Sequence, residues 1–146
     1  MDNYFPLFVH SLLRYGVLIT VAAAGLLHLR GLLAQRPILN GERSLAIVAV
    51  VLCHVQLVVG LILYAMNYES YANMRGAAGR FWKMEHLGTM LIAIVLVTLG
   101  RALSKRAKLE RSKQLRVAVF FLLGLLLMLW AIPWPFMEIG HGRGWL

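Results

Sequence analysis

The sequence predicts an all-α membrane protein: an antiparallel, up-down bundle of four transmembrane helices with both termini on the outer, periplasmic side. The chain of 146 residues is 60% hydrophobic with a mean hydropathy of +0.73, and only 14% of its residues are charged. Its apolar residues form four runs of about twenty residues, the length that crosses about 30 Å of hydrocarbon. Most basic residues lie in two of the segments between those runs.

The chain is predicted to form a single domain, residues 1–146. Residues typical of helix ends support three of its four helices. Pro6 is tolerated in the first turn of the first helix, and Ser44 is a suitable N-cap for the second. Pro133 and Pro135 end the fourth helix because proline cannot continue one. The predicted helices cover residues 5–33, 44–66, 81–103 and 116–132.

The distribution of positive charge predicts the orientation. Arginine and lysine are concentrated in the first and third loops, and cytoplasmic loops of membrane proteins carry this excess. We therefore expect a multi-pass protein of the bacterial inner membrane, with loops 1 and 3 in the cytoplasm and the lipid bilayer as its main surroundings. Because the basic residues behind the net charge of +9 are concentrated in these loops, the charge indicates the orientation in the membrane, and no nucleic-acid partner is expected.

Three histidines lie in the outer half or the middle of the predicted bundle: His10, His54 and His86. Ionisable side chains inside membrane spans are costly and mark functional sites. At a rise of about 1.5 Å per residue, His10 lies at the outer interface, His86 about 7–8 Å deep and His54 near the midplane. Two imidazoles on facing helices form a ligand set for one haem, and helix bundles build cofactor sites from such inward side chains.

We expect His54 and His86 to bind the iron, because this pair places the metal well inside the hydrocarbon. His10 is the alternative ligand, since a helix tilt of about 20° would reverse the preference. His28 lies at the cytoplasmic end of the first helix, where it can reach the interface beside Arg30. No second histidine lies at that end to complete a ligand pair, so we expect no second haem there.

Other polar or small residues fit a haem site. Arg14, one turn below the first histidine, needs an anion such as a haem propionate or Glu85. Arg80 at the outer rim is within reach of a propionate, and Gly60 lets a porphyrin approach the backbone. Gln56 is expected to support the site or handle protons, as is Glu85.

Several runs of residues along nearly the whole chain form a pattern: His10-Ser11-Leu12-Leu13-Arg14-Tyr15, His54-Val55-Gln56 with Gly60 and Leu63-Tyr64, Arg80-Phe81-Trp82 with Glu85-His86 and Met90, and Pro133-Trp134-Pro135-Phe136. As a set they resemble a family of small bacterial four-helix membrane proteins labelled cytochrome b. The resemblance implies haem b and electron transfer. It also implies functional and supporting residues, namely His10, His54, His86, Arg14, Gln56, Arg80 and Glu85.

Three functions follow as hypotheses. The first is a b-type cytochrome with one haem b, which transfers electrons between the quinone pool and a membrane or periplasmic redox partner. His10 and Arg14 would then hold a haem propionate or help to form a quinone site. The second is a cofactor-free accessory or assembly subunit of a larger respiratory complex, with interhelical hydrogen bonds such as Arg14 to Glu85. The third is a periplasm-facing copper or proton pathway through His10, His54 and Glu85. No nucleophile–base pair or phosphate loop indicates a bond-making enzyme.

Overall fold

A computed structural model describes residues 4–141 and 145 of the chain, and that part is helical with no strand. The prediction of an all-helical protein with four long apolar segments is confirmed, since four helical segments of the described part have the length and hydropathy of membrane spans. These are α1 (Tyr4–Leu33), α2 (Asn40–Met66), Gly76–Arg106 and α6 (Glu110–Ala131). The third span is continuous through α4 (Gly76–Arg80), a π-helical turn η1 (Phe81–Glu85) and α5 (His86–Arg106). Two short elements complete the order, α3 (Tyr68–Asn73) and the 3₁₀ turn η2 (Glu138–Gly140).

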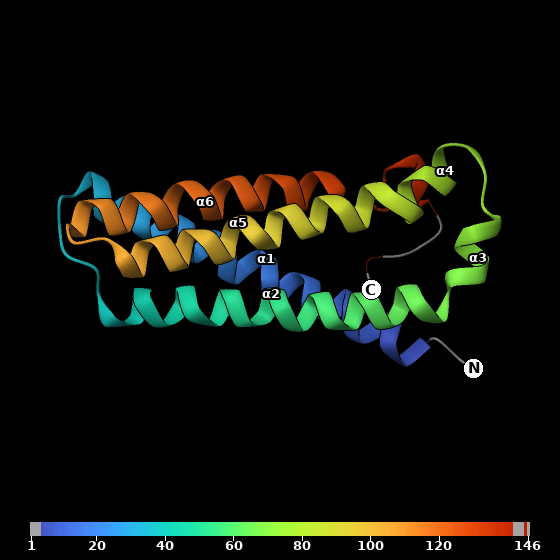
Figure 1. Cartoon of the computed structure of the whole chain (residues 1–146), viewed down its shortest axis with the longest axis horizontal. Helices are drawn as coiled ribbons and strands as arrows, with labels where there is room; N and C mark the ends of the chain where they lie inside the picture. The colour runs from blue at the N-terminus through green and yellow to red at the C-terminus, as the bar shows by residue number, and fades with distance from the viewer. Residues whose placement is uncertain (1–3, 142–144, 146) are drawn as a thin grey trace.

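The long helices lie side by side along the molecule (Figure 1). α6 packs against α5 and α1, and α2 packs against α1 and α5. The turn 34–39 and the turn 107–109 lie at one end of the bundle, while α3 and α4 lie at the other (Figure 1). The turn 34–39 contacts the start of α6, because the backbone N–H of Ile38 donates a hydrogen bond to Glu110 at 3.3 Å.

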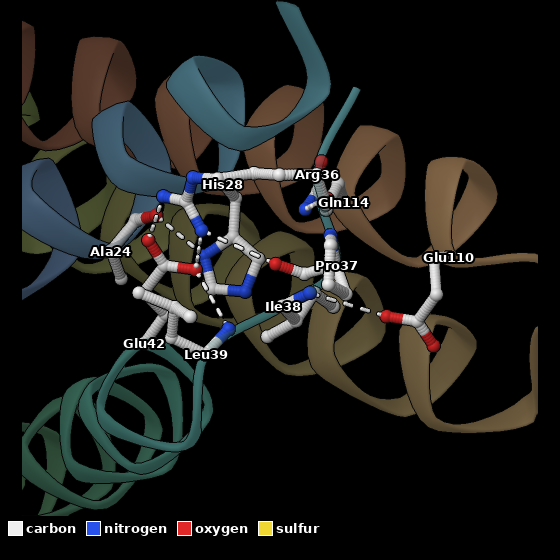
Figure 2. Close-up of polar contacts among 9 residues, drawn as sticks. All are labelled: Ala24, His28, Arg36, Pro37, Ile38, Leu39, Glu42, Glu110 and Gln114. Atoms are coloured by element: carbon white, nitrogen blue, oxygen red, sulfur yellow. Dashed lines mark hydrogen bonds and ion pairs between the residues drawn. The ribbon is translucent and has the colours of Figure 1, made fainter. Parts of the chain in front are cut away.

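The second long helix begins at Asn40, ahead of the predicted start at Ser44. The backbone N–H of Leu39 donates a hydrogen bond to the Glu42 carboxylate at 3.1 Å, and this caps the helix. Arg36 forms an ion pair with the same carboxylate, as Figure 2 shows. The hydrogen bond from the Arg36 guanidinium to Glu42 raises the pKa of Arg36 above its ordinary value.

The last long helix also begins earlier than predicted, at Glu110 rather than at residue 116. A carboxylate in the first turn is favoured because the helix N-terminus carries partial positive charge. Glu110 accepts a hydrogen bond from Lys113 within the same turn of helix and from Ile38 across the loop. The charged segment predicted as loop is therefore largely helix.

Small and medium side chains fill the core between the helices. The fully buried ones include Val21, Ala24, Ala49, Ala93, Val97, Val117 and Phe121. Large apolar side chains cover the outside instead, among them Ile19, Val58, Ile92 and Leu126. Such an apolar exterior is suited to contact with lipid hydrocarbon and small core residues let helices approach closely.

Candidate functional site

A cavity of about 520 Å³ lies between the long helices at the end that carries α3. Its volume is within the range of about 300–1,000 Å³ that is typical of small-molecule and cofactor sites. Among its lining residues are five of the eight predicted from the sequence: His10, Arg14, Gln56, Gly60 and His86. The lining is otherwise mostly apolar and aromatic.

One face of α2 forms a wall of this cavity, and His54 is not on it. Cys53, Gln56 and Gly60 line the cavity at helical spacing. His54 is rotated by about 100° from its neighbour Cys53, and it is exposed on the outer surface of the bundle. Its Nδ1 hydrogen-bonds the Val50 carbonyl of its own helix at 2.8 Å. The structure therefore does not bring His54 to the cavity that His86 lines.

His86 begins α5 and is fixed by a bond to another helix. Its Nδ1 lies 2.8 Å from the carbonyl oxygen of Ala131, the last residue of α6. A carbonyl can only accept, so Nδ1 carries the proton and the other ring nitrogen, Nε2, keeps its lone pair. Metal-binding histidines commonly have such a backbone bond on the second nitrogen. The π-helical turn Phe81–Glu85 directly precedes His86, and such turns occur often at functional sites.

His10 contributes a second imidazole to the cavity from α1. Its backbone carbonyl accepts a hydrogen bond from Gln56 Nε2 at 2.9 Å, which ties α1 to α2. A Cβ atom at Gly60 would lie 3.0 Å from His10 Cε1. Gly60 therefore makes room for the His10 ring, whereas the sequence assigned its space to a porphyrin.

Three buried polar atoms of the cavity residues have no hydrogen-bond partner within the described part of the chain: His10 Nδ1, Arg14 Nε and Gln56 Oε1. An unsatisfied buried polar group costs about 1–3 kcal/mol. Their concentration on one cavity indicates a place where a ligand or water supplies the missing partners.

Arg14 and Glu85 do not pair in the structure. Arg14 Nη2 donates to the backbone carbonyl of Trp145 at 2.6 Å, and the Tyr15 hydroxyl donates to the same oxygen at 2.7 Å. Glu85 instead accepts from Arg80 Nε at 2.5 Å, with side-chain exposures of 36% and 69%. Arg80 and Glu85 are absent from the residues that line the cavity, so they form an exposed ion pair outside its wall.

Three aromatic residues of the cavity were not among the site residues predicted from the sequence, because aromatic side chains are common at membrane–water interfaces and do not by themselves mark a site. Tyr64 and Tyr71 have ring centroids 5.6 Å apart, and Tyr71 stacks on Trp82 at 5.8 Å with an interplanar angle of 6°. All three line the cavity. The signal available in the sequence was the position of Trp82 one helical turn before His86, which puts the two side chains on the same face of a helix.

Within residues 4–141 and 145, no three His, Cys, Asp or Glu side chains are grouped so that they could hold a metal ion. Haem iron needs only two axial side chains, because the porphyrin supplies its other ligands. No family model matches the sequence, and no curated protein or solved structure is significantly similar to it.

Proposed function

We propose that this protein is a b-type cytochrome of the bacterial inner membrane, which transfers electrons between the quinone pool and a partner redox protein. The observation that carries the proposal is the presence of two imidazoles from different helices, His10 and His86, on one largely apolar cavity of about 520 Å³. Cofactor sites in helix bundles are built in this way from side chains on facing helices.

The residues of the cavity fit a haem. His86 offers Nε2, since its Nδ1 is committed to the Ala131 carbonyl. His10 offers a buried ring nitrogen without a partner among the described residues, and the buried Arg14 Nε is suited to a propionate. When bound, haem b supplies a one-electron iron couple whose potential depends on its axial ligands and on the exclusion of water. The apolar helices provide that exclusion.

The proposed ligand pair is thus His10 with His86, the alternative among the predicted pairs. His54 lies on the outer surface of α2 and bonds its own helix, so it is assigned no contact with the iron. The proposal keeps Gln56 as a supporting group, because its side-chain oxygen is unpartnered and buried beside His10 in the described structure. Arg80 and Glu85 act at the rim.

Orientation is part of the proposal. The helices run antiparallel, both termini are periplasmic and the two basic turns are cytoplasmic, in accordance with the positive-inside rule. Arg36, Arg43 and Lys113 lie in or beside these turns, which share one end of the bundle. The haem cavity then lies in the periplasmic half, where a periplasmic partner exchanges electrons with it.

The test is spectral. Purified protein reduced with dithionite should show b-type bands, and the pyridine haemochrome should give one haem per chain. His86→Ala and His10→Ala should each remove most of the haem, whereas the matched control His54→Ala should retain it because His54 is outside the cavity. Folded protein without porphyrin, or loss of haem in His54→Ala alone, contradicts the proposal.

The cofactor-free accessory subunit is the second candidate, and two contacts favour it. The His86–Ala131 and Gln56–His10 hydrogen bonds join helices without any ligand, as structural polar groups do. Colourless protein that co-purifies with a large respiratory complex supports this candidate. One copper per chain without iron supports the copper pathway instead.

A further inference from the structure

A second cavity, of about 200 Å³, lies at the opposite end of the bundle from the first, beside the turn between α1 and α2. Four helices and that turn contribute to it. Its lining residues are His28, Ile38, Arg43, Ala46, Arg101, Ser104, Lys105, Lys113 and Val117. No lining residue is shared with the first cavity, so its ligand chemistry is independent of the proposed haem.

The lining contains four cationic side chains and no carboxylate: Arg43, Arg101, Lys105 and Lys113. Of the two nearby carboxylates, Glu42 pairs outside the lining and Glu110 neutralises one lining residue, Lys113. Glu42 holds Arg36 and caps Leu39, while Glu110 pairs with Lys113 and accepts from Ile38, as Figure 2 shows in part. Within the described residues, Arg43, Arg101 and Lys105 form no ion pair. The cavity therefore carries excess positive charge.

Arg101 is the lining residue whose side chain most clearly lacks a hydrogen-bond partner. Its Nε is buried and has no hydrogen-bond partner in the described part of the chain. It is the remaining such side-chain atom there, after the three that line the first cavity. A guanidinium is planar and presents its N–H groups as a fork that matches the oxygens of phosphate or carboxylate. The charge of Arg101, its place in the lining and the shape of its guanidinium favour an oxyanion.

The walls favour a compact anion. Ser104 is 4% exposed and contributes a hydroxyl that can donate, and Ile38, Ala46 and Val117 form apolar sides. His28, 2% exposed, is fixed by the bond between its Nδ1 and the Ala24 carbonyl at 2.8 Å. The side chains that can contact an anion come from α2, α5 and α6, and α1 contributes His28 to the lining.

We propose that this second cavity binds a phosphate group, with Arg101 as its central contact and Arg43, Lys105 and Lys113 around it. The phosphate belongs either to the headgroup of an anionic phospholipid or to a free phosphate in solution. Both sources are chemically suited, since juxtamembrane basic clusters attract anionic lipids and arginine forks bind phosphate oxygens. This site extends the function of the basic turns beyond setting topology.

The experiment uses the purified full-length protein in neutral detergent. Inorganic phosphate and dioctanoyl phosphatidylglycerol are titrated separately, and the shift of the unfolding midpoint gives each apparent affinity. Stabilisation by phosphate alone identifies a free anion as sufficient, and stabilisation by the lipid alone identifies a headgroup. Both results support the site. Stabilisation by neither probe overturns it.

Variants locate the binding. Arg101→Gln should weaken binding of the active probe about tenfold or more, because one charge-assisted hydrogen bond is lost. Arg106→Gln is the matched control: it removes the same charge from an exposed position on the same helix, outside the cavity. Lys105→Gln, an exposed lining residue, gives a second measurement if Arg101→Gln does not fold. Equal weakening in Arg106→Gln and the cavity variants overturns the proposal, and haem content should not change in any of them.

Discussion

At the scale of single residues, His54 and His86 make the same kind of hydrogen bond with different consequences. The Val50 carbonyl that His54 contacts is inside α2 and already accepts from the helix backbone. The Ala131 carbonyl that His86 contacts is at the end of α6, where the last carbonyls lack intrahelical partners. The His86 bond therefore stabilises the fold as well as orienting the ring.

This difference predicts unequal effects on stability. In haem-free protein, His86→Ala should lower the free energy of unfolding by about 1–3 kcal/mol, because a buried acceptor loses its donor. His54→Ala should change it by less than about 0.5 kcal/mol, as substitutions at exposed positions usually do. Equilibrium unfolding in mixed detergent, followed by tryptophan fluorescence, measures both. Equal losses in the two variants would show that the Ala131 bond contributes nothing.

At the scale of elements, glycine sets how closely α5 and α6 approach. A Cβ at Gly100 would lie 2.6 Å from Phe120 Cβ, and one at Gly124 would lie 2.8 Å from Val97 Cγ2. Gly88, on the same helix as Gly100, has nothing within 4 Å of the corresponding position. Of these three glycines, Gly100 and Gly124 are required by packing and Gly88 is not.

Gly100→Ala should therefore destabilise the protein by about 1–3 kcal/mol, the usual cost of overpacking a well-filled interface. Gly88→Ala should be neutral or stabilise by up to about 1 kcal/mol, because alanine is the better helix former. Thermal unfolding of the two variants in the same detergent compares them. A stabilised Gly100→Ala variant would contradict this prediction, because it would show that α5 and α6 can move apart to accept the added methyl group at little cost.

The existence of the long helices can be predicted from the sequence, whereas the positions of their ends and the π-helical turn cannot. Length and hydropathy suffice for the four long helices, because few other structures satisfy an apolar backbone segment in lipid. The starts at Asn40 and Glu110 depend on contacts with Arg36 and Ile38, which only the folded turns bring together. Nothing in the local sequence announces the π-helical turn Phe81–Glu85.

The candidate site was predicted in part for a related reason. His10, Arg14 and His86 were identified because polar groups stand out in apolar runs, and all three line the cavity. On α2, Gln56 and Gly60 were also identified, but His54 was wrongly placed with them, because lipid and protein neighbours are both apolar and leave little periodic pattern. The sequence pattern therefore did not reveal that Cys53, rather than His54, faces inward.

At the scale of the whole molecule, the two cavities occupy opposite ends of one bundle, and the lining residues of each include at least one buried polar atom that lacks a partner in the described chain. The proposed orientation assigns the imidazole cavity to the periplasmic half and the cationic cavity to the cytoplasmic end. An anionic cytoplasmic leaflet would then lie beside the cationic cavity. The orientation therefore decides which ligands can reach each end.

Single cysteines test this orientation in intact cells. Glu69→Cys places a thiol on exposed α3, and Lys108→Cys places one in the turn 107–109; the native Cys53 is 1% exposed and serves as the unlabelled background. A membrane-impermeant maleimide should label Glu69→Cys on whole cells and Lys108→Cys only after lysis, because the basic turns face the cytoplasm. The reverse pattern would place the imidazole cavity on the cytoplasmic side, and electron exchange with a periplasmic partner would lose its structural basis.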